Sequence, residues 1–178
     1  MRTHVLDSVD LRILSALQIK GRATNVEIAE YAAITAPPAL RRTRTLEEQR
    51  VIHGYYAVLD AKKLGYDTCA FIQVRLESQA APLVREFEAL MRDVPNVREC
   101  HALSGQRDFL LKCVFRNLAD AQHFVTETLL KTGNVASVVT SFCIHVTKNE
   151  PDVPLALVEA PPPPSAARKL KLLPLPRT

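Results

Sequence analysis

The sequence predicts an α+β protein of two domains: an N-terminal helix-turn-helix (winged-helix-like) domain followed by a ferredoxin-like βαββαβ domain. Residues 6–50 contain apolar residues at helical spacing in short, well-capped segments. Residues 65–146 alternate between strand-like and helix-like periods in the order βαββαβ. The chain has 178 residues, 47% of them hydrophobic, which is enough for two small cores.

The first helix is predicted to begin after Asp7 and to end at Gly21. Asp7 can act as the N-cap, with Asp10 three residues later in a variant of the capping box. Leu14 and Leu17 then contribute to an apolar stripe of helical period. These features predict a helix that buries one face.

Two further short helices are predicted, with a tight bend between them. Thr24 and Glu27 form a complete capping box at the start of the second helix. Thr35 is predicted to cap the third helix, whose first turn contains Pro37 and Pro38, where missing N–H groups cost little. A helix pair of this form is typical of small DNA-binding domains.

The third helix is predicted to have one apolar and one basic face. At about 100° per residue, the apolar face comprises Ala39, Leu40, Thr43 and Leu46. The opposite face comprises Pro38, Arg41, Arg42, Thr45 and Gln49, with Arg44 at its edge. On an isolated helix, a solvated charged surface is the ordinary explanation. As the third of three capped helices, this segment instead predicts insertion into the DNA major groove.

The predicted domains are residues 1–52 for the helix-turn-helix, 53–64 for a β-strand linker, 65–150 for the ferredoxin-like domain and 151–178 for a Pro-rich, extended or disordered tail. The ferredoxin-like elements are, in order, a strand around residues 70–76, a helix over 83–91, the strands Val97–Ser104 and Phe109–Phe115, a helix capped by Asn117 and the strand Val135–Val146. Both helices are expected on one face of the sheet. Phe71 and Val139 alternate onto the other face, and self-association is the simplest way to bury it.

Composition excludes several classes of protein. A formal charge of +4 permits nucleic-acid binding without requiring it. No apolar run approaches the ~20 residues of a membrane-spanning helix, and the N-terminus lacks a signal-peptide pattern, so a cytoplasmic protein is expected. The five glycines are not spaced for a phosphate-binding loop. The four cysteines form no CxxC pair, so small buried side chains are a simpler interpretation than disulfides or zinc ligands.

The sequence resembles the Lrp/AsnC (feast/famine) family of transcriptional regulators over roughly residues 6–150. The matching stretches are LDSVDLRILSALQIKGRATNVEIA, ALRRTRTLEEQRVIHGYYAVLDAKKLGYD, ECHALSGQRDFLLK and NVASVVTSFCIHVTK. The resemblance implies a DNA-binding helix-turn-helix, a β-strand linker and an effector domain that dimerises through its sheet, with dimers often assembling into octamers. It also implies a small effector, usually an amino acid.

The candidate residues follow from this resemblance and from the helix faces. The DNA-binding candidates are Thr24, Asn25, Thr35, Pro37, Pro38, Arg41, Arg42, Arg44 and Thr45. The resemblance implies effector binding near the glycine-to-aspartate turn and the last strand, at Ser104, Gly105, Gln106, Arg107, Asp108 and Thr140. No catalytic residue, metal ligand or cofactor site is predicted.

The chain departs from the family pattern at several positions. Arg50 stands where a glycine usually ends the recognition helix, so a positive φ there would cost stability, although Arg50 could also contact a phosphate. Thr43 replaces a branched apolar residue and Thr45 a common arginine. Gln106 and Arg107 replace a small acidic or aromatic pair, and Arg107 can either pair with an α-carboxylate or remain a surface arginine.

The leading hypothesis is a sequence-specific regulator that binds double-stranded DNA as a homo-oligomer, a dimer or an octamer, under control of an amino-acid effector. One alternative is an enzyme resembling siroheme decarboxylases on the same architecture. Those proteins have histidine-, tyrosine- and tryptophan-rich strands, whereas this chain has no tryptophan and only His101 in the corresponding stretch. Another alternative is an effector-binding co-regulator that does not itself bind DNA.

Overall fold

A computed structural model describes residues 6–150 and 153–155, so most of the tail predicted over 151–178 lies outside the described residues. The chain forms two compact units, which divide between Val58 and Leu59 and again between Lys148 and Asn149. The first division precedes the predicted boundary near Leu64. Each unit has its own core and is described separately.

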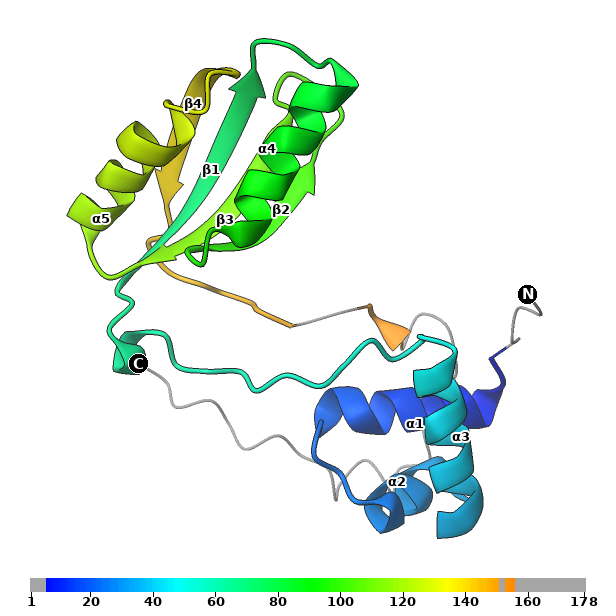
Figure 1. The fold of residues 1–178 in the computed structure, drawn as a ribbon. Coiled ribbons are helices and arrows are strands. Elements are labelled where there is room, and N and C mark those ends of the chain that lie inside the picture. Colours follow the sequence, from blue (N-terminus) through cyan, green and yellow to red (C-terminus); the bar gives the residue numbers. More distant parts are fainter. Residues whose placement is uncertain (1–5, 151–152, 156–178) are drawn as a thin grey trace. The chain divides into compact units, whose positions relative to one another are not determined.

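The N-terminal unit contains three helices, α1 (Ser8–Ile19), α2 (Asn25–Ala32) and α3 (Ala36–Glu48) (Figure 1). Its core is contributed by all three helices and consists mainly of Ile13, Ile28, Ala29, Ala32, Ala39 and Leu46. Small residues on α2 and α3 allow these helices to approach closely. The predicted apolar face of α3 is largely confirmed, with Leu40 only half-buried.

The N-termini of the three helices are capped in different ways. The Asp7 side chain accepts hydrogen bonds from backbone N–H groups of α1, and Thr24 caps α2, both within reciprocal capping boxes as predicted. Thr35 occupies the N-cap position of α3, but its side chain forms no capping hydrogen bond, so the predicted cap is wrong. An N-cap side chain accepts from the second or third helical N–H. Those positions are Pro37 and Pro38, which have no N–H.

Two helices end with a non-glycine residue in the left-handed conformation. Arg50 follows α3 with φ 56°, while the Val51 N–H donates to the Leu46 carbonyl at 2.9 Å in a Schellman-type closure. Ala33 follows α2 with the same φ of 56°. A left-handed conformation costs a residue with a Cβ about 1–2 kcal/mol. Arg50 thus has the positive φ at which a residue other than glycine costs stability.

The segment predicted as a β-strand linker is not a strand in the single chain. Residues 53–60 are in neither a helix nor a strand, and Lys62–Leu64 form a 3₁₀ turn ending at Gly65. A strand requires a neighbouring strand for its backbone N–H and C=O groups. No described segment of the chain lies beside this one in a ladder. Its apolar side chains remain exposed, notably Tyr56 (87%) and Val58 (76%).

The second unit has the predicted βαββαβ order (Figure 1). Its elements are β1 (Thr68–Leu76), α4 (Ala81–Asp93), β2 (Val97–Ala102), β3 (Phe109–Phe115), α5 (Leu118–His123) with its continuation η2 (Phe124–Leu129), and β4 (Val135–Phe142). The sheet order is β2-β3-β1-β4, and every neighbouring pair is antiparallel. β1 and β3 are therefore the central strands.

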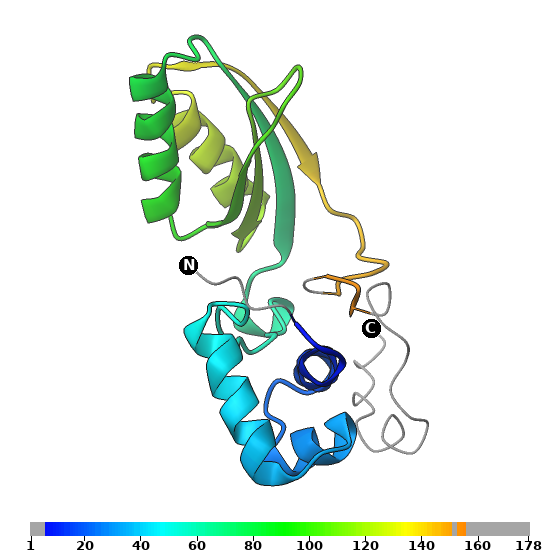
Figure 2. The ribbon, with the colours of Figure 1, turned by 90° about the vertical axis from the view of Figure 1, so that its right-hand side faces the viewer.

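Both helical segments cover the same face of this sheet, as Figure 2 shows. β1 alternates strictly, with Ala70, Ile72, Val74 and Leu76 buried against the helices. Phe71 lies on the opposite face and is 39% exposed, and Val139 on β4 is 42% exposed. The expected one-sided burial of the sheet is confirmed, and its other face has no covering layer within the described chain.

Two predicted elements differ in detail. β4 ends at Phe142 rather than Val146. One more ladder bond follows it, from the Cys143 N–H to the Cys69 carbonyl at 2.8 Å, and β1 itself begins at Thr68, so the partner strand is nearly at its end here. The second helix continues from α5 into a π-helical turn, η2, whose Leu129 is fully buried. Apolar spacing alone does not distinguish the two helical forms.

We predict that Arg50→Gly stabilises the N-terminal unit by about 0.5–1 kcal/mol, because glycine removes the left-handed penalty but loses more entropy on folding. Urea unfolding of the full chain, monitored by circular dichroism, measures this change. Arg50→Ala is the matched control, since it removes the charge and keeps the Cβ. A glycine variant less stable than the alanine variant would contradict the interpretation.

Candidate functional site

The exposed face of α3 presents two arginines for which the described part of the chain offers no ion-pair partner. Arg41 and Arg44 are both exposed, and within the described residues neither forms an ion pair. The Thr45 hydroxyl donates to the Arg41 carbonyl at 3.1 Å, which leaves that side chain turned back on its own helix. The half-buried Thr45 hydroxyl therefore already uses its hydrogen-bond donor within α3. The guanidinium groups of Arg41 and Arg44 are exposed and can bind an anionic partner.

Arg42 is held by carboxylates instead. Its Nη1 donates to Asp7 Oδ2 at 2.7 Å and to Asp10 Oδ1 at 2.8 Å, and only 2% of the Asp10 side chain is exposed. Hydrogen bonds to Asp10 and Asp7 raise the pKa of Arg42, and the backbone N–H of Asp10, followed by Arg42, lowers the pKa of Asp7. Arg42 therefore ties α3 to the start of α1, and a contact between Arg42 and DNA stays a prediction.

The remaining DNA-binding candidates lie at the N-termini of α2 and α3. Thr24 and Asn25 are exposed, although the Thr24 side chain is engaged with Glu27 in the capping box. Thr35 and Pro37 are exposed and Pro38 is half-buried at the start of α3. A helix N-terminus carries a partial positive charge, so both ends favour a phosphate nearby.

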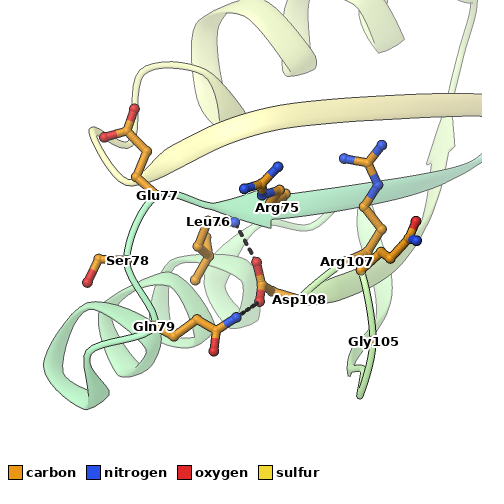
Figure 3. Close-up of a pocket in the computed structure, with 9 residues that line it drawn as sticks. Arg75, Leu76, Glu77, Ser78, Gln79, Gly105, Arg107 and Asp108 are labelled. Carbon is orange, nitrogen blue, oxygen red and sulfur yellow. Dashed lines mark hydrogen bonds between the residues drawn. The ribbon is translucent and has the colours of Figure 1, made fainter.

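A polar pocket lies where the end of β1 meets the turn before β3. Its volume is about 780 Å³, and it is lined by Arg75, Leu76, Glu77, Ser78, Gln79, Gly105, Gln106, Arg107 and Asp108 (Figure 3). Sequence reasoning identified the last four of these. It also included Ser104 and Thr140, which the structure does not bring to the lining; Thr140 pairs with Ile72, farther along the sheet.

Asp108 fixes the geometry of this pocket. Its carboxylate accepts from the Leu76 N–H and from Gln79 Nε2, both at 2.7 Å. Its backbone N–H donates to the Val74 carbonyl at 2.9 Å, and its carbonyl accepts from Leu103 at 2.8 Å. These bonds join the turn to the end of β1 and to the segment that precedes α4. Asp108 is thus a positioning residue whose oxygens are already engaged.

Two arginines supply positive charge to the same pocket. Arg107 is half-buried and its Nη1 donates to Ser137 Oγ on β4 at 2.8 Å. Arg75 extends from the exposed face of β1, and Figure 3 shows both side chains pointing toward the same side. Glu77 also lines the pocket, and Figure 3 shows its side chain extending away from the two arginines. Cationic and anionic groups at one site match the two charges of an amino acid.

Sequence reasoning missed the wall formed by residues 75–79. In the sheet order, β1 neighbours β3, so the end of β1 must lie beside the start of β3 and the turn before it. Asn134 supports this wall: its Oδ1 accepts from the Ser78 N–H at 3.0 Å and its Nδ2 donates to the Ser78 carbonyl at 3.2 Å. The order of the strands in the sheet could have predicted that residues 75–79 line the pocket, whereas the spacing of residues in the sequence could not.

His101, the histidine considered for an enzyme, lies exposed on the edge strand β2. Its Nε2 is 3.1 Å from Glu99 Oε2, and Lys112 Nζ is 2.7 Å from the other Glu99 oxygen. Lys112, followed by His101, lowers the pKa of Glu99. His101 is not among the residues that line the polar pocket of Figure 3. Across residues 6–150 and 153–155, no group of histidine, cysteine and acidic side chains is arranged to hold a metal ion.

Comparison with known proteins gives matches in both units. The model of the AsnC-type helix-turn-helix domain matches residues 6–47, and that of the Lrp/AsnC ligand binding domain matches residues 69–153. A leucine-responsive regulatory protein of Rhizobium meliloti is 49% identical over 81% of this chain and 92% of its own length. A Bkd operon transcriptional regulator of Pseudomonas aeruginosa is 37% identical over 78% and 91%, respectively.

A solved structure of similar fold is a transcriptional regulator of Neisseria meningitidis in complex with L-Met. It has a TM-score of 0.83 and 35% identity, covering 87% of this chain and 100% of that one. Among the helices that the structure describes, none has the length and apolar character needed to cross a membrane.

We predict that Arg42→Ala destabilises the N-terminal unit by about 1–3 kcal/mol, because it removes the charged hydrogen bonds that Arg42 donates to Asp7 and to the buried Asp10. Arg41→Ala is the matched control and should change the free energy of unfolding by no more than about 0.5 kcal/mol. Chemical denaturation at neutral pH measures both variants.

The pH dependence provides a second check. Since folding lowers the pKa of Asp7 below 3.8, its contribution is present above that pH and lost as the pH falls through the folded-state value. The stability difference between Arg42→Ala and the wild type should shrink in the same range. Equal stability of the two proteins at pH 7 would contradict the structural role of Arg42.

Proposed function

We propose that this chain, which belongs to the Lrp/AsnC family of transcriptional regulators, binds double-stranded DNA sequence-specifically through α3 and responds to a small amino acid bound at the Gly105–Asp108 turn. The DNA-binding part of the proposal rests on the different environments of the three arginines of α3. Arg42 is held by two carboxylates, while Arg41 and Arg44 are exposed and form no ion pair with residues 6–150 or 153–155. Such a helix is fixed to its domain and presents its other cations outward.

The DNA contacts proposed for α3 fall into two kinds. Arg41 and Arg44 divide between base edges in the major groove and phosphates, with Pro38 and Thr45 close to the groove floor. Thr24, Asn25, Thr35 and Pro37, at the N-termini of α2 and α3, contact the backbone. Neutralised phosphates make the affinity salt-dependent. A two-fold dimer then favours half-sites about one helical turn, or a multiple of it, apart.

The effector proposal rests on the charge of the pocket. In it, Arg107 binds the α-carboxylate, with Arg75 nearby, and Glu77 attracts the ammonium group. The Neisseria regulator was solved with L-Met, which is one amino acid to test here. A bound ligand alters DNA binding only if it binds one conformation or assembly of the protein more tightly than another.

Self-association is proposed through the uncovered face of the sheet. Phe71 and Val139 on this face leave 39% and 42% of their surfaces exposed. In the N-terminal unit, Tyr56 and Val58 are also exposed. Exposed apolar side chains on an uncovered sheet face favour an interface. A second copy supplies the matching sheet face by two-fold symmetry, and it can also supply a strand to pair with residues 53–60. Dimers of this kind can assemble into octamers.

The alternatives are less well supported. The matched domains belong to regulators rather than to enzymes, and His101 is exposed on an edge strand and paired with Glu99. A co-regulator that no longer binds DNA would not need two free arginines on a well-anchored helix. The proposed protein acts in the cytoplasm, where bacterial DNA lies, without a cofactor, a metal ion or contact with a membrane.

We predict that genomic footprinting will find discrete sites occupied by the wild-type protein, with occupancy that changes when one amino acid is added. Arg41→Ala/Arg44→Ala should lose this occupancy, since each lost base or phosphate contact weakens binding by about 1–3 kcal/mol. Arg98→Ala, a change on the effector unit outside the pocket, is the control and should retain the sites. Unchanged occupancy in the double variant would refute the assignment of α3.

We also predict that calorimetry over the set of amino acids will identify a ligand whose affinity falls about 10- to 100-fold in Arg107→Gln, the loss expected for a charged hydrogen bond. Arg98→Gln is the matched control and should bind as the wild type does. If no amino acid binds, the effector proposal fails while the DNA-binding proposal stands. If Arg107→Gln binds normally, Arg107 is only a surface residue.

A further inference from the structure

Two cysteines far apart in the sequence face each other across neighbouring strands. Cys69 is the second residue of β1, and Cys143 directly follows the last residue of β4. The ladder pairs Ala70 with Phe142, and the Cys143 N–H donates to the Cys69 carbonyl at 2.8 Å, so the two cysteines are the next directly opposed pair. Opposed residues of a hydrogen-bonded antiparallel pair have Cα atoms about 5.5 Å apart. This separation lies within the range that a disulfide spans.

Their side chains lie on the same face of the sheet, because directly opposed residues of a ladder point to the same side. Both are half-buried, and the Cys143 thiol donates to the His145 carbonyl at 3.5 Å. Burial is the main reason that the pKa of Cys69 is raised. The resting form of Cys69 is therefore the protonated thiol.

The other two cysteines provide an internal comparison. Cys113 is buried on the helix-covered side of the sheet, and Cys100 is exposed on β2. In the β2–β3 register, Cys100 pairs with Leu111 and Cys113 pairs with Val97, so these cysteines do not face each other. Of the four cysteines, only Cys69 and Cys143 are directly opposed across a strand pair.

We propose that Cys69 and Cys143 are a redox modification site, where a hydroperoxide converts the two thiols into a reversible cross-strand disulfide. One of the two thiols first loses its proton, and its sulfur then attacks the O–O bond, forming a sulfenic acid, while the departing oxygen takes up the proton and leaves as water or an alcohol. The second thiol attacks that sulfur, the S–S bond forms, and water leaves with the sulfenic oxygen. Two electrons pass from the thiols to the peroxide, which balances the reaction.

The position of this pair gives the disulfide a structural consequence. β1 begins where the chain arrives from the N-terminal unit, and the segment after Cys143 returns to it. The disulfide would join both connections at the point where they leave the sheet. A disulfide in a hydrogen-bonded ladder departs from relaxed geometry, so thiol reductants should open it readily. Such reversibility suits a reducing compartment, where persistent disulfides are rare.

Trypsin separates the four cysteines into peptides 64–75, 99–107, 113–116 and 132–148, so mass spectrometry can assign each linkage. After hydrogen peroxide treatment of the folded full chain, we expect peptides 64–75 and 132–148 to be linked within one chain. The chain mass should fall by two hydrogens, and dithiothreitol should reverse the change. Cys69→Ser and Cys143→Ser should each abolish the linked peptide, whereas Cys100→Ser should retain it.

Three results would overturn the proposal. The first is oxidation of Cys100 with no link between the other two peptides. The second is a link formed only between separate chains, detected as a covalent dimer without reductant. The third is a link that appears only after the protein is unfolded in denaturant, which would show that the folded pair does not react.

Discussion

The constraint on which the molecule depends is that its four-stranded sheet is covered on one face only. Both helical segments pack against the alternate residues of β1 and β3, and this layer forms the core of the second unit. The opposite face retains Phe71 and Val139 at its surface. Since burial of apolar area stabilises proteins by roughly 25 cal/mol per Å², a surface of this kind favours association with a second copy.

β1 links the features of the second unit because it is central in the sheet. Its C-terminal end supplies Arg75 and Leu76 to the pocket, where Asp108 joins it to the turn before β3. Its N-terminal end places Cys69 opposite Cys143. Residues between these ends include Phe71, on the uncovered face. One strand thus connects the proposed ligand site, the proposed interface and the proposed thiol pair.

Much of the architecture was predictable because it depends on local patterns. The capping boxes at Asp7 and Thr24, the alternation of β1 and the order of the elements all follow from neighbouring residues. The left-handed conformation of Arg50 was predictable because a helix terminus of this type usually requires glycine.

The features that the sequence did not predict depend on contacts between segments far apart in the chain. Arg42 looked like its neighbours on α3, yet α1 folds beside it and brings two carboxylates from 32 and 35 residues away. The pocket wall over residues 75–79 depends on sheet order, and the absence of a ladder over residues 53–60 depends on which strands are available. No local pattern carries this information.

The most direct test is sedimentation equilibrium of the full chain, because both the interface and the proposed control by an effector depend on pairing of sheets. The account predicts that the wild type has the mass of a dimer or a multiple of it. Phe71→Glu should sediment as a folded monomer, whereas Leu118→Glu, at an exposed position on α5, should sediment as the wild type does. A monomeric wild type, or an unchanged mass for Phe71→Glu, would contradict the account.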